Sequence, residues 1–177
     1  QGLNTIAYSP DGISYTGLGS SMFSAQGNCC CWNGSIWVAG GGGTNSLATS
    51  TDGINWIGLG NIFNSFCKSI AWNGTYFVAV GSDTTNNIKY STNGTTWNNV
   101  TTSNTIFTNY GLGVAWNGKI WVAVGSGTNA IATSSDGLNW IGRGATLLTT
   151  SYSIAYNNNV WVAGGGGTNS LIWSSDG

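Results

Sequence analysis

The stretch "AWNGKIWVAVGSGTNAIATSSDGLNWIG" (Ala115–Gly142) decides the fold, because near copies of it recur along the chain. Three other segments align with it: "CWNGSIWVAGGGGTNSLATSTDGINWIG" from Cys31, "AWNGTYFVAVGSDTTNNIKYSTNGTTWNN" from Ala71 and "AYNNNVWVAGGGGTNSLIWSSDG" from Ala155. A Ser-x-Asp/Asn-Gly box recurs at spacings of 41, 41, 43 and 40 residues, with its acidic or amide residue at Asp11, Asp52, Asn93, Asp136 and Asp176. The chain is therefore a tandem repeat.

Each copy divides into four short predicted strands. The first ends at a Trp-Asn-Gly tripeptide (Trp32, Trp72 and Trp116), where Asn-Gly predicts a two-residue hairpin with positive φ angles. The second, such as "IWVAV", is apolar on both faces and must be covered on both sides. The third, "AIATS", leads through the box into the fourth, "LNWIG". A period of about 41 residues with four strands predicts an all-β fold, a β-propeller of four-stranded antiparallel blades.

The ends of the chain repeat one another. Residues 1–12, "QGLNTIAYSPDG", align with residues 166–177, "GGTNSLIWSSDG". We therefore expect a single domain over residues 1–177, with four repeats and one duplicated strand. Two explanations of the surplus strand stay open: the chain is a section of a longer array, or the strand pairs with another chain, because an unpaired edge is a template for association.

The composition excludes several classes of function. The chain has four Lys and Arg, five Asp and no His, which leaves no basic patch for nucleic acid. No apolar run reaches the roughly 20 residues that span a bilayer, so we expect no membrane insertion. Ten Trp, seven Tyr and five Phe supply the apolar area, and Asn, Ser, Thr and Gly supply the polar surface. Such a surface favours an extracellular or virion-surface setting.

The boxes "STDGINW" from Ser50 and "SSDGLNW" from Ser134 resemble the Asp-box, or BNR, repeat of sialidase-like propellers. The resemblance implies a structural role for Asp11, Asp52, Asn93, Asp136 and Asp176, in turns that face away from any ligand. Sialidase chemistry is not carried over, because Arg143 is the single Arg and Glu is missing. Similar tandem repeats also occur in uncharacterised proteins of large DNA viruses.

We expect no enzyme activity and no catalytic residue. A glycosidase needs two carboxylates beside one bond, and four of the five Asp lie in the boxes. Without His, neither a Ser-His-Asp nor a Cys-His arrangement can be built. The residues also predict no metal site and no cofactor.

The leading hypothesis is a non-catalytic, lectin-like binding module for carbohydrate or another cell-surface ligand. The loops between second and third strands, and those between fourth and first strands, would share one rim, and variable loops are a usual place for binding. The ligand-binding candidates are Asn45, Asp83, Asn129, Asn169, Phe63, Phe107 and Tyr152. The alternative at these positions is that the Asn residues cap turns and the aromatic residues belong to the core. A competing hypothesis for the whole chain is a structural repeat protein of a virion surface, fibre or filament, with self-association through the surplus strand.

The triplet Cys29–Cys30–Cys31 occupies first-strand positions that the other copies fill with "SIA" or "GVA". Three adjacent strand residues cannot converge on one tetrahedral zinc, and alternation places Cys29 and Cys31 on one face and Cys30 on the other. We therefore expect packing of small thiols, with a disulfide involving these residues or Cys67 as the alternative.

Overall fold

The computed structural model describes residues 2–101 and 103–177, without the side chains of residues 103 and 104. Seventeen strands and one short helix, α1 (Ser103–Ile106), are present in these ranges, so the prediction of an all-β fold is confirmed. The strands are β1 (Ala7–Tyr8), β2 (Thr16–Gly17), β3 (Gln26–Trp32), β4 (Trp37–Gly42), β5 (Leu47–Ser50), β6 (Ile57–Gly58), β7 (Phe66–Trp72), β8 (Phe77–Ser82), β9 (Ile88–Ser91), β10 (Asn98–Asn99), β11 (Tyr110–Trp116), β12 (Trp121–Ser126), β13 (Ile131–Ser134), β14 (Ile141–Gly142), β15 (Thr150–Tyr156), β16 (Trp161–Gly166) and β17 (Leu171–Ser174).

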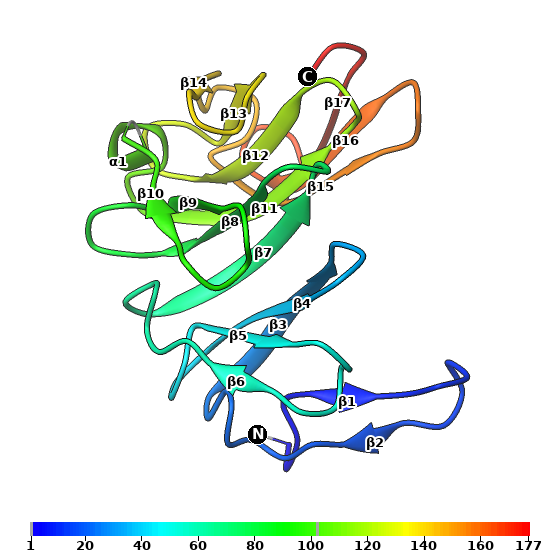
Figure 1. Cartoon of the computed structure of the whole chain (residues 1–177). Coiled ribbons are helices and arrows are strands. Elements are labelled where there is room, and N and C mark those ends of the chain that lie inside the picture. The colour runs from blue at the N-terminus through cyan, green and yellow to red at the C-terminus, as the bar shows by residue number, and fades with distance from the viewer. Residues whose placement is uncertain (1, 102) are drawn as a thin grey trace.

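The strands pair as antiparallel units that follow the sequence repeat (Figure 1). Units β3–β6, β7–β10 and β11–β14 each have four strands, β15–β17 has three, and β1–β2 is an isolated hairpin that corresponds to a third and a fourth strand. Two bridges, Gly42 with Phe66 and Ser126 with Thr150, link neighbouring units into one eight-stranded and one seven-stranded curled sheet.

The core lies between neighbouring units, which explains why the second strands are apolar on both faces. Val78 and Val80 on β8 are fully buried together with Trp121 of the next unit. Val38 on β4 packs in the same way in a cluster with Phe77 of β8. A second strand is therefore covered on both sides, as predicted.

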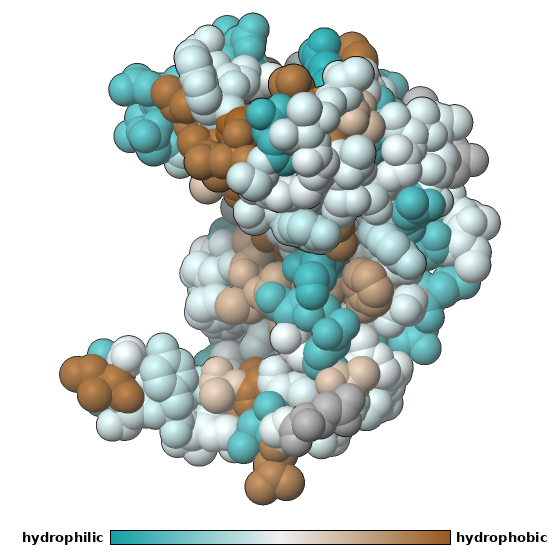
Figure 2. Space-filling model, turned by 180° about the vertical axis from the view of Figure 1, so that it is seen from behind, coloured by the Kyte–Doolittle hydropathy of each residue, from teal (hydrophilic) through white to brown (hydrophobic). Residues whose placement is uncertain are grey.

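The units curve into an arc with an open side. Seen from behind, the arc has an upper and a lower arm with a mouth between them (Figure 2). The hairpin β1–β2 and the unit β15–β17 lie at the two ends of the arc (Figure 1). Each end therefore has a side that no other unit of this chain covers.

The turn after the first strand differs from the prediction of a two-residue hairpin. Trp32 pairs with Trp37, which leaves four residues in the connection. Gly34 has a positive φ, whereas among described non-glycine residues only Asn158 does. The reason is side-chain capping: the Asn33 Oδ1 accepts hydrogen bonds from the Ser35 and Ile36 N–H groups. The Asn33 N–H also donates to the Ile36 carbonyl oxygen at 3.3 Å, so Gly34 and Ser35 form the tip of the turn in place of the predicted Asn33 and Gly34.

The box residues accept hydrogen bonds from the backbone of their own turns. In the third full unit the Asp136 Oδ1 accepts from the N–H groups of Leu138 and Asn139 at 2.8 and 2.7 Å. The indole N–H of Trp140 donates to the Gly137 carbonyl oxygen at 3.0 Å. Asp11, Asp52 and Asn93 accept from their own turns in the same way.

Candidate functional site: the loop rim

Two sets of loops meet along one rim, as the sequence predicts. The Thr44 N–H, between second and third strands, donates to the Ser24 Oγ, in the connection ahead of β3, at 3.0 Å. Thr128 donates to the Thr108 Oγ1 in the same way at 3.1 Å. We call this edge of the molecule the loop rim.

The predicted Asn candidates tie these loops together. The Asn45 side chain is buried, donates to the Met22 carbonyl oxygen and accepts from the Gly60 N–H, each at 2.8 Å. Asn129 repeats the arrangement with the Ile106 carbonyl oxygen at 2.9 Å and the Gly144 N–H at 2.8 Å. Their amide groups therefore have structural partners on both sides.

Asn169 has a weaker version of this bridge. Its amide group donates to the Leu147 carbonyl oxygen at 3.3 Å, and the residue is exposed. The unit β15–β17 has no fourth strand to supply the N–H group that Asn45 and Asn129 receive. Of the three predicted Asn residues, Asn169 keeps the most accessible amide group.

Asp83 lies inside its unit in an ion pair. Its Oδ2 is 2.8 Å from the Lys89 Nζ, and the two side chains are only 4% and 7% exposed. Burial raises the pKa of Asp83, but the hydrogen bond from Lys89 and those from its own loop outweigh this effect and hold the pKa below its usual value. The carboxylate is therefore ionised and already paired with Lys89.

The three aromatic candidates separate into two groups. Phe63 and Phe107 are fully buried, whereas Tyr152 is 63% exposed. The burial follows from glycine in the second strand: a Cβ at Gly125 would lie 2.8 Å from the Phe107 Cδ1, and one at Gly81 would lie 3.1 Å from the Phe63 Cδ1. Only Tyr152 of the three presents its ring to solvent.

The structure adds an aromatic pair that the sequence interpretation missed. Phe66 and Tyr110 begin β7 and β11, and their ring centroids lie 6.0 Å apart. Tyr110 is 46% exposed. The sequence contains a signal for this pair, because both residues occupy the first position of the first strand in their repeats. The corresponding residues are Gln26 in β3 and Thr150 in β15.

Polar side chains flank this pair. The Lys68 Nζ lies 6.0 Å from the centroid of the Phe66 ring and 3.4 Å from the Asn28 Oδ1. The Asn28 amide group in turn donates to the Cys67 carbonyl oxygen at 2.9 Å. Asn28, Lys68 and Tyr152 occupy one repeat position, at the register shift of β3, β7 and β15. The loop rim thus combines exposed aromatic rings with hydrogen-bond donors.

The cysteines line the first strands near this rim, and all four are free thiols. Cys67 is fully buried, with Cys29 and Cys31 packed against the same cluster, whereas Cys30 is exposed. Burial raises the pKa of Cys31 to about 11, with smaller contributions from Cys30 and Cys29. Burial, reinforced by Cys29, also raises the pKa of Cys67 well above its usual value. The thiols of Cys31 and Cys67 are therefore protonated at neutral pH.

Within residues 2–101 and 103–177 we found no group of three or more His, Cys, Asp or Glu side chains that could hold a metal ion. In the same ranges, no helix has the length and apolar character needed to cross a membrane.

Comparisons with known proteins bear on the fold alone. No family model and no curated protein matches the chain. A computationally designed protein, Ika4, matches all of this chain over 99% of its own, with 12% identity and a TM-score of 0.61. A chain of a nidogen/laminin complex matches 92% of this chain over 64% of its own, with 11% identity and a TM-score of 0.69. The GH74 enzyme of Niastella koreensis matches 85% of this chain over 22% of its own, with 15% identity and a TM-score of 0.61. The chain thus spans less than two thirds of the length of the last two.

Proposed function

We propose that the chain is a non-catalytic binding module of β-propeller type, in which units β3–β6, β7–β10 and β11–β14 are blades. The sequence period, the four-stranded antiparallel units and the curved arrangement support this assignment. In the same proposal the boxes are structural Asp-box turns. Their carboxylates are engaged by their own backbone, as at Asp52 and Asp136.

The ligand-binding surface in this proposal is the loop rim, and its ligand is a carbohydrate or another uncharged cell-surface group. The observation that carries the proposal is the exposure of two aromatic side chains, Tyr110 and Tyr152, on the contacting first strands β11 and β15, with the ring of Phe66 beside that of Tyr110. Flat rings can stack on the apolar face of a sugar while Lys68 and Asn28 donate hydrogen bonds to its hydroxyl groups. An extracellular or virion-surface location belongs to the same proposal.

The absence of catalysis is also part of the proposal. The chain contains neither His nor Glu. Lys89 neutralises Asp83, and the carboxylates of the box Asp residues accept hydrogen bonds from their own turns. None of these described carboxylates is therefore free to act as a general acid or base at the loop rim.

A glycan array probed with the intact chain tests the binding proposal. We expect binding that Tyr110→Ala and Tyr152→Ala each weaken by about tenfold or more, by analogy with nucleic-acid bases stacked on aromatic side chains, which contribute about 1–3 kcal/mol per ring. Ile141→Ala is the matched control, since Ile141 is 61% exposed on the outer strand β14. An array without any bound sugar, or equal binding by all variants, would contradict the proposal.

A second candidate function is a structural repeat protein. The observation that favours it is the exposed apolar face of β16 and β17, where Leu171 and Trp173 are 67% and 73% exposed. A large exposed apolar patch commonly marks an interaction site. Assembly would not exclude ligand binding, because the face and the loop rim are different surfaces.

A further inference from the structure

Neighbouring units are joined by one repeated contact. The box glycine of each unit lies against a valine on the second strand of the preceding unit. A Cβ built on that glycine would lie 2.9 Å from the valine Cγ2 in the first interface and 3.2 Å in the next two; the pairs are Gly94 with Val38, Gly137 with Val78 and Gly177 with Val122. The three valines are 0%, 0% and 1% exposed. Glycine allows this close approach because it has no side chain.

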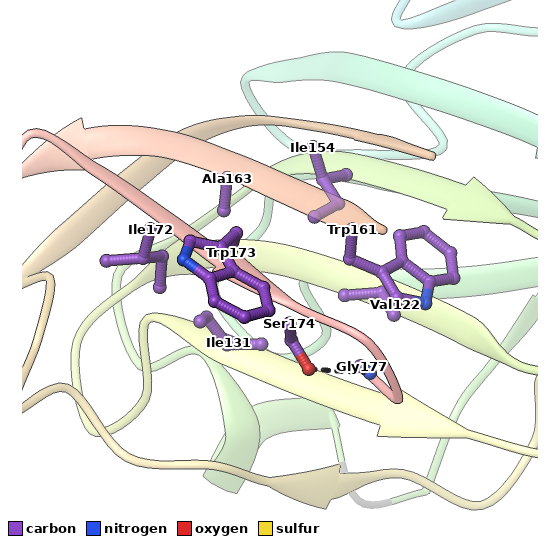
Figure 3. A pocket seen from close by; sticks show the side chains of 9 residues that line it. All are labelled: Val122, Ile131, Ile154, Trp161, Ala163, Ile172, Trp173, Ser174 and Gly177. Atoms are coloured by element: carbon purple, nitrogen blue, oxygen red, sulfur yellow. Dashed lines mark hydrogen bonds between the residues drawn. The ribbon is translucent and has the colours of Figure 1, made fainter. Parts of the chain in front are cut away.

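Figure 3 shows the last of these contacts from close by. Gly177 lies beside Val122 and Trp161, and its N–H donates a hydrogen bond to the Ser174 Oγ at 2.9 Å. Trp173 of β17 borders the same small pocket. The unit β15–β17 is therefore seated on its predecessor through its own box.

Within residues 2–101 and 103–177, no glycine packs on the fourth valine of the series in this way. Val162 on β16 is 36% exposed, and a hollow beside it is lined by Val160, Val162, Leu171, Ile172 and Trp173. We call these five residues the open face. Figure 2 shows a hydrophobic patch on the upper arm, at the mouth of the arc. The open face is thus the equivalent of surfaces that the other units bury.

At the opposite end of the arc, a box glycine lacks the valine against which the other box glycines pack. A Cβ at the box glycine Gly53 would meet only Trp37 of its own unit within 4 Å, because no preceding valine lies there. A hollow of about 730 Å³ separates the unit β3–β6 from the hairpin β1–β2, with Tyr8, Trp37 and Gly53 in its lining. This hairpin corresponds to a third and a fourth strand without the first and second. We call the hollow the vacant site.

We propose that a second copy of this chain fills the vacant site with its β15–β16 hairpin, so that one four-stranded unit is built from two molecules. Its first and second strands are β15 and β16 of the second copy, and its third and fourth strands are β1 and β2 of the first. The β17 strand of the second copy is displaced from the edge of β16. Val162 of the second copy then lies against Gly53 of the first and restores the repeated contact.

The exchange is favoured because β1 and β17 form equivalent turns. The Ser9 Oγ donates to the Asp11 Oδ1 at 2.8 Å, and the Ser174 Oγ donates to the Asp176 Oδ1 at 2.7 Å. The exchange gives up the contact of Gly177 with Val122, and by the repeat alignment Gly12 of the first copy takes the place of Gly177. The gain is the fourth strand β2, which β17 lacks, together with the burial of apolar surface around Val162.

The register of the shared unit follows from the pairing of β16 with β17. Trp161 now pairs with Ser174 and Val162 with Trp173. Because residues 1–12 align with residues 166–177, we expect Trp161 of the second copy to pair with Ser9 of the first, and Val162 with Tyr8. A second copy suits this surface better than an unrelated protein, because the three internal interfaces already show this sequence packing on itself.

The interface is head-to-tail, and this property gives the test. Val162→Asp disables the open face, and Tyr8→Asp disables the vacant site. We expect the 177-residue wild type to associate in sedimentation velocity across a concentration series. Either variant alone should weaken association by at least about 100-fold, because an unpaired carboxylate would be buried. A mixture of the two variants should form heterodimers, since one intact interface remains between them.

Ile141→Asp is the matched control, because it adds the same charge to an exposed outer strand. Circular dichroism verifies that each variant stays folded, and both altered residues are at least partly exposed in the single chain. A wild type that remains monomeric, or a mixture that forms no heterodimer, would overturn the proposal.

The displacement of β17 has its own measurement. Hydrogen exchange at residues 171–174 should be faster in the assembled wild type than in monomeric Val162→Asp. Equal or slower exchange in the assembly would mean that β17 stays paired, which overturns the strand exchange. Sugar binding at the loop rim should be unchanged per chain in Val162→Asp, so this proposal and the binding proposal can fail separately.

Discussion

Asp83 and Lys89 form a buried ion pair in which the carboxylate Oδ2 and the ammonium Nζ lie 2.8 Å apart. The Lys89 Nζ also lies 5.3 Å from the centroid of the Phe63 ring. The corresponding third-strand position is Ala48 in one unit and Ala132 in another. The pair thus belongs to the interior of a single unit, although Asp83 is a ligand-binding candidate in the sequence analysis.

Asp83→Ala should lower the free energy of unfolding by about 3–5 kcal/mol, because it leaves the buried Lys89 ammonium without its counter-charge and with the Asn99 Oδ1 as a remaining acceptor. The double variant Asp83→Ala with Lys89→Ala should regain a large part of this loss, since Ala is native to that position elsewhere. Urea denaturation of the single and double variants measures the difference. Equal stability of the two would show that the ion pair is not what holds Lys89.

Asn45→Ala should cost about 1–3 kcal/mol of stability, because the Gly60 N–H and the Met22 carbonyl oxygen lose their buried partner. Asn169→Ala is the matched control with an expected change of about 0.5 kcal/mol or less, since its single bond is longer and exposed. The midpoints of chemical denaturation compare them. If folded Asn45→Ala binds the ligand more weakly than the wild type does, Asn45 takes part in binding and is not only a structural residue.

Trp140→Phe should destabilise the chain more than Trp121→Phe. The Trp140 indole N–H donates to the Gly137 carbonyl oxygen, and its loss costs about 1–3 kcal/mol. The indole nitrogen of Trp121 is buried and has no hydrogen-bond partner within the described part of the chain, and the equivalent residue of the preceding unit is Phe77. Thermal unfolding of both variants gives the order, and the reverse order would contradict the hydrogen-bond assignments.

Asp136→Asn should flatten the acid side of the pH–stability profile. Burial raises the pKa of Asp136, but hydrogen bonds from Asn139, Leu138 and Ser134 outweigh it and hold the pKa below its usual value. A lowered carboxyl pKa stabilises the fold above the unfolded-state value of about 3.9, and this contribution disappears as the pH falls further. The wild type should therefore lose stability below about pH 4 relative to the variant. Unfolding measured from pH 7 downward tests this, and parallel profiles would rule it out.

The thiols should react slowly with a disulfide reagent such as DTNB in the native state. Burial raises the pKa of Cys67 and Cys31, and the thiolate is the reactive form. We expect Cys30 to react first, because it is the exposed member of the triplet, and we expect four thiols after unfolding. Fewer than four thiols in the unfolded chain would point to a disulfide instead of packed thiols.

Much of the fold was predictable because the repeat states the same information several times. The box at Asp136 and its relatives predicts local hydrogen bonds, which depend on residues only two or three positions away. The second strand around Val122 predicts burial on both faces. The turn at Asn33 was predicted less well, because its side-chain cap competes with the backbone preference of Asn-Gly.

The candidate site was predictable in location but not in composition. Loop lengths and variability predict which edge carries the irregular loops, and the hydrogen bond from the Thr44 N–H to the Ser24 Oγ shows that these loops meet. Whether an aromatic side chain on that edge faces inward depends on the neighbouring strand. Phe107 is buried because Gly125 leaves room beneath it, whereas Tyr110, three residues later, keeps part of its ring in solvent.

The sequence by itself determined the strand order, the box turns and the apolar second strands, because these depend on local hydrogen bonding and on the alternation of side chains. Tertiary structure alone decided that Asp83 is neutralised by Lys89, that Tyr110 and Tyr152 are exposed, and that Val162 is only partly covered. The reason is that burial and pairing depend on which unit stands next to which. Identical repeat positions such as Val122 and Val162 therefore have different surroundings.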